Sequence, residues 1–160
     1  MATRKLQTDL KKRKGFDLPE QEVVVSVLRT NELYQYRFGQ LFREYGLTQP
    51  QYNILRILRG EGEKLPSLEI ARRMIAVVPA ITSLIDKLEK RELVKRERCK
   101  DDRRVWYVGL TAKGKKLLAA MDEPNIAMHK RLAGHLSESE CTQLLGLLEK
   151  ARKAVESEAS

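Results

Sequence analysis

The sequence has few of the features of secreted, membrane or disulfide-stabilised proteins. Its 160 residues include only two cysteines, Cys99 and Cys141, which form no C-x-x-C pair. No apolar run approaches the roughly 18–20 residues that a membrane-spanning helix needs. The Lys-rich start is not followed by the apolar stretch of a secretory signal. These absences predict a protein of the reducing cytoplasm without a disulfide framework or a membrane partner.

Motifs of catalysis and metal binding are also missing. The two histidines, His129 and His135, have no cysteine or carboxylate cluster beside them and do not have the i, i+4 spacing of a helical metal site. The sequence contains no glycine-rich phosphate loop and no nucleophile elbow. We therefore expect the protein not to be an enzyme, and we expect no cofactor and no metal.

What the sequence does have is an excess of basic residues. It contains 31 Lys and Arg against 22 Asp and Glu, a net charge of +9, with 42% hydrophobic residues, enough for one compact domain. Residues 1–14 carry +5 and residues 64–116 carry +8, whereas residues 15–63 and 117–160 each carry −2. Such a concentration of one sign is typical of a module that faces phosphates. We expect residues 1–16 to be a basic, mobile tail, either solvated or in contact with phosphates.

Hydrophobic periodicity predicts a mainly helical chain. Apolar residues recur at spacings of three and four, which indicates amphipathic helices. Thr48 with Gln51 and Ser137 with Glu140 have the spacing of capping boxes, which satisfy free N–H groups at helix starts. The last helix has an a/d seam, the pattern of helix against helix, and Cys141 lies on it. The expected helices cover residues 19–45, 48–58, a short stretch from 67, 79–91, 111–121 and a last stretch from 137.

Between residues 93 and 110 the period changes from 3.6 to 2. Residues 93–96 and 105–108 are expected to form two strands, joined by a polar tip. Helix, short helix, helix and hairpin is the order of a winged helix-turn-helix, in which one helix enters the major groove of DNA and a basic hairpin tip reaches the minor groove. An ordinary solvated, charged turn is the alternative interpretation of the tip.

Several groups of residues resemble the MarR family of transcriptional regulators, in the same order and over about residues 20–155. They are Leu47-Thr48-x-x-Gln51-Tyr52-x-x-Leu55, Ile81-Thr82-x-Leu84-Ile85-Asp86-Lys87-Leu88-Glu89-Lys90-Arg91, Asp102-Arg103-Arg104 and Leu110-Thr111-x-x-Gly114. The resemblance implies a mainly α fold with a small β-hairpin wing. It assigns residues 17–46 and 117–160 to N- and C-terminal dimerisation helices and residues 47–116 to the DNA-binding lobe of a single intertwined domain.

The resemblance also implies a function and a set of partners. A homodimer would bind double-stranded DNA at a pseudo-palindromic operator, usually as a repressor, and a small aromatic or phenolic effector would release it. Such a protein is expected in the cytoplasm, with the nucleoid.

Site residues follow from the resemblance position by position. The base-facing candidates on the recognition helix, residues 78–91, are Val78, Pro79, Ala80, Thr82, Ser83 and Lys87. The DNA-binding candidates in the wing are Arg98, Lys100, Arg103 and Arg104. Asp102 is expected to hold one of these guanidinium groups by a charge-assisted hydrogen bond. An effector pocket is expected at Tyr34, Arg37, Phe38, Met74 and Ile75, for which ordinary core packing is the alternative.

The chain departs from the family pattern at several positions. Ser83 stands where the family often has Arg, Glu92 where it often has Gly, and Cys99-Lys100 where an Asp-Pro pair is frequent. Val77 and Val78 replace residues that are commonly Ser or basic. Because a bidentate Arg–guanine contact is then weakened, thymine methyl contacts and shape readout gain importance, and we predict A·T-rich sites.

The sequence is also compatible with two other functions. A winged helix can bind RNA or protein without operator specificity, since fold does not fix function. The second alternative is a thiol redox switch, because Cys99 lies among Arg98, Lys100 and Arg103, cations that favour a thiolate. Cys141 is expected to be a packing residue.

Overall fold

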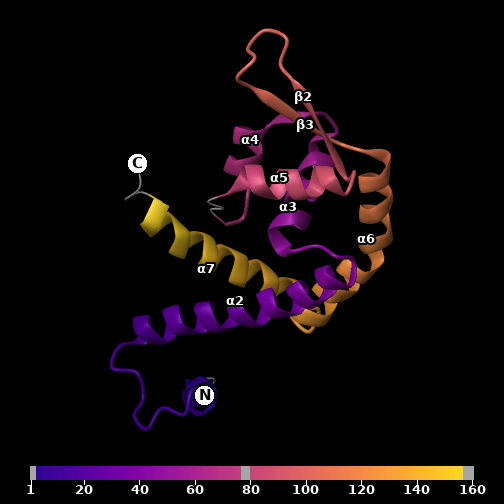
Figure 1. Cartoon of the computed structure of the whole chain (residues 1–160). Coiled ribbons are helices and arrows are strands. Elements are labelled where there is room, and N and C mark those ends of the chain that lie inside the picture. Colours follow the sequence, from indigo (N-terminus) through magenta and orange to yellow (C-terminus); the bar gives the residue numbers. More distant parts are fainter. Residues whose placement is uncertain (1–2, 77–79, 157–160) are drawn as a thin grey trace. The chain divides into compact units, whose positions relative to one another are not determined.

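The chain folds into two compact units, Met1–Met121 and Asp122–Ser160. A computed structural model describes residues 3–76 and 80–156. Helices predominate, and the first unit also holds a small antiparallel sheet (Figure 1), which confirms the mainly α fold with a hairpin wing. Among the described helices, none combines the length and apolar character that crossing a membrane requires.

The first unit begins with two helices, α1 (Thr3–Asp9) and α2 (Pro19–Glu44). The basic tail, for which we expected mobility, thus contains a short helix. Helix α2 has the predicted extent and is followed by Gly46, whose φ of 69° lies in the left-handed region that glycine favours. The buried residues of α2, Leu41 and Phe42, are near its C-terminal end, where the helix contacts α3.

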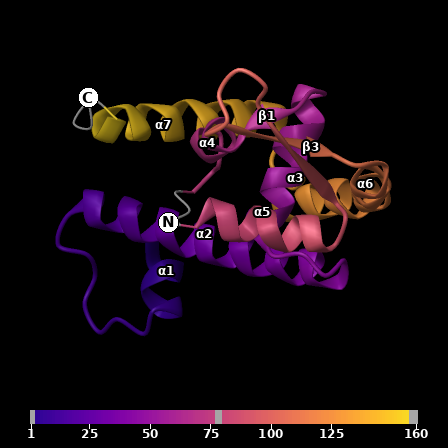
Figure 2. The ribbon, with the colours of Figure 1, turned by 45° about the horizontal axis from the view of Figure 1, so that its top comes forward.

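Helix α3 (Gln49–Glu61) is the centre of the core. Its predicted capping box is confirmed, since the Thr48 N–H donates to Gln51 Oε1 at 2.9 Å and the Gln51 N–H donates to Thr48 Oγ1 at 3.4 Å. Helices α4 (Ser67–Arg72) and α5 (Ile81–Lys90) both contact α3. Figure 2 shows α3 beside both α5 and the sheet. The fully buried side chains here include Ile54, Leu55, Leu58, Ile70, Ile85 and Leu88.

The sheet has three strands in the order β1-β3-β2, all antiparallel. Strands β2 (Val94–Arg98) and β3 (Trp106–Leu110) form the predicted hairpin, with both strands extending further along the chain than expected. The hairpin register pairs Val94 with Leu110 and Arg98 with Trp106. Strand β1 (Leu65–Pro66) was not predicted, because a two-residue strand has no periodicity and is defined by its pairing with β3.

A tight junction joins the hairpin to helix α6 (Ala112–Ala133). The Thr111 hydroxyl donates to the Glu92 carbonyl at 2.7 Å and accepts from the Gly114 N–H at 3.0 Å. A Cβ on Gly114 would lie 2.3 Å from the Leu93 carbonyl oxygen, so only glycine fits at this position. The predicted end of this helix at Met121 is wrong, because α6 continues through Pro124 and crosses the boundary between the two units.

The second unit contains the end of α6 and helix α7 (Glu138–Glu156). Its predicted capping box is confirmed by the Ser137 N–H, which donates to Glu140 Oε2 at 2.8 Å, and the Glu140 N–H, which donates to Ser137 Oγ at 3.3 Å. No residue of α7 is buried within the described chain. Apolar side chains of the predicted seam and its neighbours are therefore exposed, among them Leu144, Leu145, Leu147 and Val155.

Candidate DNA interface

Helix α5 has one buried and one exposed face, as its sequence predicts. Ile85 and Leu88 are 1% and 0% exposed, so this side packs into the lobe. Thr82, Ser83 and Lys87 are exposed, and four-residue spacing places Ser83 and Lys87 on the same side of the helix. Ala80 is exposed at the N-cap position, whereas the candidates Val78 and Pro79 lie outside the described residues. The exposed side of α5 thus presents the hydroxyls of Thr82 and Ser83 and, further along, the ammonium groups of Lys87 and Lys90.

The tip of the wing presents four cations. All four wing candidates are exposed, and the main chain at the tip is closed by hydrogen bonds from the Cys99 N–H to the Val105 carbonyl (2.9 Å) and from the Val105 N–H to the Asp102 carbonyl (3.0 Å). These four residues are the predicted set of Arg98, Lys100, Arg103 and Arg104.

Asp102 contacts Arg104 as expected. Asp102 Oδ1 accepts from the Arg104 main-chain N–H at 2.9 Å and from Arg104 Nε at 3.2 Å. These hydrogen bonds, the main-chain one first, hold the pKa of the Asp102 carboxyl below its ordinary value. The carboxylate therefore orients a guanidinium that is 92% exposed. The part of either residue in DNA binding stays a prediction.

The base of the wing is joined to α5 through Arg96 on strand β2. Arg96 Nη1 lies 2.7 Å from Asp86 Oδ1, and Arg96 Nη2 lies 2.7 Å from Glu89 Oε2. The guanidinium of Arg96 holds the pKa of the Glu89 carboxyl below its ordinary value, and Glu89 in turn raises the pKa of Arg96. Sequence reasoning missed this cluster, because its members occur on two elements with different periods.

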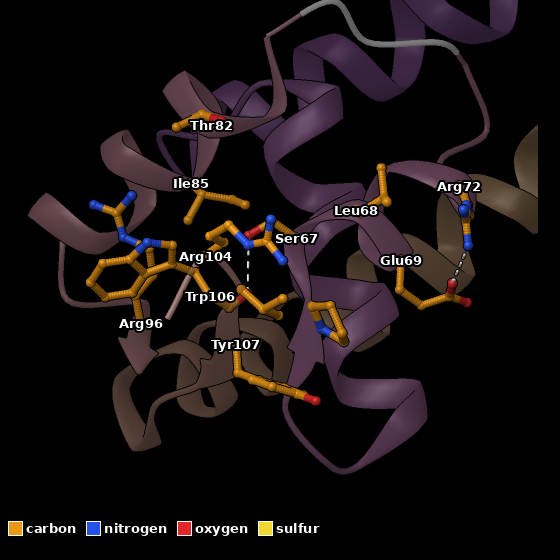
Figure 3. A pocket seen from close by; sticks show the side chains of 12 residues that line it. Ser67, Leu68, Glu69, Arg72, Thr82, Ile85, Arg96, Arg104, Trp106 and Tyr107 are labelled. Carbon is orange, nitrogen blue, oxygen red and sulfur yellow. Dashed lines mark hydrogen bonds and ion pairs between the residues drawn. The ribbon is translucent and has the colours of Figure 1, made fainter. Parts of the chain in front are cut away.

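A cavity of about 650 Å³ lies between α4, α5 and the wing (Figure 3). Thr82 of the recognition helix and Arg104 of the wing, which the sequence assigns to separate groups, both line it. Trp106 is 42% exposed there, and its carbonyl accepts a hydrogen bond of 3.4 Å from the Ser67 hydroxyl. The lining consists of Pro66, Ser67, Leu68, Glu69, Arg72, Thr82, Ile85, Arg96, Arg104, Val105, Trp106 and Tyr107.

Helix α4 contributes residues to this face that the sequence did not single out. Leu68 is 65% exposed, and the side chain of Arg72 is 70% exposed. Trp106 could have been identified in the sequence as an aromatic residue that alternates with basic residues in the expected hairpin.

The residues proposed for an effector pocket lie on α2 and after α4. Phe38 stacks on Phe42 with ring centroids 5.7 Å apart, and Arg37 lies over the ring of Tyr36 at 5.9 Å. Met74 is half-buried, but Ile75 is 72% exposed. The cavity between α4, α5 and the wing is lined by none of the five candidates, which also include Tyr34. The effector pocket stays a prediction.

The two cysteines are free thiols, and both are half-buried. Cys99 lies between two exposed cations in the wing, and Cys141 lies on α7. Redox sensing by Cys99 stays a prediction. Within the described chain, no three His, Cys, Asp or Glu side chains are grouped as a metal site would need.

Residues 47–106 match the family model described as the MarR family. The chain is 31% identical over 105 residues to the HTH-type transcriptional regulator MhqR of Bacillus subtilis (strain 168), covering 64% of this chain and 72% of that protein. It is 24% identical over 127 residues to the homoprotocatechuate degradative operon repressor of Escherichia coli, covering 79% and 85%. The crystal structure of a MarR transcription factor from Planctomyces limnophilus is similar at 39% identity and a TM-score of 0.66, covering 84% of this chain and 98% of that one.

Proposed function

Because the chain belongs to the MarR family of DNA-binding transcriptional regulators, we propose that it binds a pseudo-palindromic operator as a homodimer and represses transcription. Proteins of this family are transcription regulators and not enzymes. The observation that carries the proposal is the cavity that Thr82 and Arg104 line together. A helix face and a basic hairpin tip on one surface are what simultaneous major- and minor-groove contacts require.

Sequence readout is assigned to α5 and the residues just before it. The hydroxyls of Thr82 and Ser83 accept or donate hydrogen bonds at base edges, and the methyl group of Thr82 packs on thymine. Arg104, oriented by Asp102, enters the minor groove, where a narrow A·T tract concentrates negative potential. We therefore expect A·T-rich half-sites, and a G·C-rich motif at both half-site and wing positions would contradict this readout.

Dimerisation is assigned to residues 17–46 and 117–160, and DNA binding to residues 47–116. Apolar side chains support this division, because Val23, Val24, Val27 and Leu28 of α2 are between 44% and 60% exposed. The exposed apolar residues of α7 give the second unit a similar surface. Burial of such faces against a second copy removes apolar area from water at about 25 cal/mol per Å². Two lobes would then read half-sites about one helical turn, roughly 34–36 Å, apart.

The proposed function includes repression and release from DNA by an effector. A similar protein of Escherichia coli is an operon repressor, and a dimer bound at an operator occludes the DNA that it covers. A small aromatic or phenolic molecule would bind among Tyr34, Arg37, Phe38, Met74 and Ile75 and favour release. At about 100 times its dissociation constant, an effector stabilises the protein by roughly 2.7 kcal/mol, so a thermal-shift screen of aromatic acids tests this step. Location with the nucleoid belongs to the same proposal.

The test of the function is a specificity ratio. Selection from random duplexes should yield a motif that the protein binds about 10³-fold or more tightly than unselected DNA. Arg104→Ala should weaken binding and lower the salt slope by about one unit, whereas Lys153→Ala on α7 should change neither. Equal affinity for selected DNA, unselected DNA and RNA would instead identify a nucleic-acid-binding module without an operator.

A further inference from the structure

Arg96 of strand β2 joins the recognition helix to the wing through ion pairs and hydrogen bonds. Its Nη1 meets Asp86 at 2.7 Å, while its Nη2 and Nε meet Glu89 Oε2 at 2.7 and 2.8 Å. The main-chain N–H of Arg96 also donates to Glu89 Oε1 at 3.0 Å. Both Glu89 oxygens are therefore held by one residue of β2, which fixes the position of the strand along the helix.

The contact of Arg96 with both carboxylates restricts the position of the wing relative to α5 more than a single ion pair would. A guanidinium is planar and donates in fixed directions, so two carboxylates on successive turns of α5 set both its distance and its rotation. The Arg96 side chain is 27% exposed, less than most ion-paired side chains in the lobe, so water and salt screen it less.

Trp106 extends the contact across the hairpin. Its ring lies 5.9 Å from the Arg96 guanidinium carbon and 5.2 Å from that of Arg98. Arg98 and Trp106 are also partners in the strand register. The orientation of Arg98, one of the candidate DNA-binding cations, is thus coupled to Arg96 through the indole ring.

The carboxylates of Asp86 and Glu89 are expected to oppose DNA binding. Asp86 and Glu89 belong to the helix that faces DNA, and their negative charges oppose the approach of phosphates. Arg96 neutralises one of these two charges and attaches the wing through both carboxylates, which gives a physical reason for acidic residues at these positions of a basic lobe.

We propose that Arg96, together with Asp86 and Glu89, is a positioning residue for DNA recognition, which holds the wing at a fixed distance from α5. Thr82 and Arg104 then meet their grooves simultaneously, without an entropic cost of ordering the wing on binding. This inference rests on the proposed function, since it concerns the binding of a selected operator.

Glu89→Gln tests the proposal by the sign of its effect. If charge alone matters, removing an acidic group tightens binding to every DNA. If the contact positions the wing, the ratio of selected to unselected binding falls about tenfold, in the range of coupling within a network. Asp101→Asn removes an acidic group from the wing tip without touching this contact, and it should leave the ratio unchanged.

A double-mutant cycle with Arg104→Ala provides the second readout. In the wild-type background, loss of Arg104 weakens binding to the selected duplex, and in the Glu89→Gln background the same change should weaken it several-fold less, because the wing is no longer held. Trp106 is the only tryptophan of the chain, so acrylamide quenching of its fluorescence should increase in Glu89→Gln and in Arg96→Lys. Circular dichroism checks that each variant is folded. If Arg96→Lys does not fold, the test depends on Glu89→Gln alone.

Three results would each overturn either the positioning role or the proposed function. A ratio of selected to unselected binding that is unchanged or raised in Glu89→Gln overturns the positioning role. An unchanged effect of Arg104→Ala in the two backgrounds also overturns it. A wild-type protein that prefers no duplex over another overturns the proposed function itself.

Discussion

The outer face of α5 and the tip of the wing border the same cavity, but their chemistry differs. The exposed residues at the start of α5 carry the hydroxyls of Thr82 and Ser83, and the two exposed cations of the helix, Lys87 and Lys90, lie in its last turn. The wing carries four cations between residues 98 and 104, all of them exposed. One surface is suited to hydrogen bonds with base edges, and the other to phosphates and a narrow minor groove.

In the proposed function, this difference assigns affinity mainly to the wing and specificity mainly to α5. Phosphate contacts give most of the binding energy and its salt dependence, but they carry no sequence information. Base contacts do carry it, and in the proposed function they are made by a few small, mostly uncharged side chains. The net charge of +9 therefore predicts how tightly DNA is held and says little about which DNA is chosen.

The largest effect is expected from removal of the wing cations. Changing all four to Gln should weaken binding to selected and unselected DNA alike, by on the order of a thousandfold, because each lost phosphate contact lowers the salt slope by about 0.9. Titration of a fluorescent duplex at several salt concentrations measures both quantities. The four changes are Arg98→Gln, Lys100→Gln, Arg103→Gln and Arg104→Gln.

The matched control removes the same charge from the basic tail. Changing Lys11, Lys12, Arg13 and Lys14 to Gln lowers the net charge by the same amount away from the wing. A much smaller loss is expected, since the position of the charge matters more than its sum. Equal losses in the two quadruple variants would contradict the division between wing and helix.

The next largest effect should come from Ser83→Arg. An arginine at this exposed position can donate two hydrogen bonds to guanine O6 and N7, which discriminates by about 1–3 kcal/mol. The selected motif should then contain a G at the contacted position. Ser83→Gln is the control, because an amide instead pairs with adenine, and identical motifs for both variants would show that residue 83 does not face a base.

Glu92 lies in the connection between the two regions, since it follows α5 and precedes β2. Its φ of 60° lies in the left-handed region that costs a residue with a side chain roughly 1–2 kcal/mol relative to glycine. Glu92→Gly should raise Tm by about 2–4 °C, although it removes an exposed ion pair with Lys113. Glu92→Ala keeps the strain and loses the pair, so its Tm should not rise, and equal rises would contradict backbone strain as the cause.

The smallest effect concerns the pH dependence of stability at the Arg96 contact. The pKa of Glu89 is lower in the folded protein than its ordinary value, chiefly because of the hydrogen bond from Arg96. The stabilisation is therefore present above the ordinary carboxyl pKa and is lost as pH falls through the lowered value. Because the Glu89 side chain is 34% exposed, the contribution is small. Urea midpoints of wild type and Glu89→Gln should differ near neutral pH and converge as the pH falls below the lowered pKa of Glu89; a constant difference would contradict this account.

Local patterns predicted much of the fold. The two capping boxes and the apolar face of α5 depend on residues three or four apart, so they could be identified directly in the sequence. The contact between Asp102 and Arg104 is equally local. Glu92 stood where glycine is frequent in the family, and its positive φ explains why that departure matters.

Non-local features could not be predicted in this way. Strand β1 is defined by pairing with β3, which is far along the chain. The Arg96 contact joins a strand to a helix, and no periodicity connects its members. The cavity likewise forms only when α4, α5 and the wing pack together. Three-dimensional proximity of Thr82 and Arg104 is therefore a result of the fold and not of the motifs.

Helix α6 contains a proline that lowers the cost of bending the helix. It belongs to both compact units, and its buried residues, Gly114, Leu118 and Met121, all precede the boundary. Pro124 lies just beyond it and lacks the N–H that would complete the helical hydrogen bonds. Bending therefore costs less at this point than elsewhere in the helix.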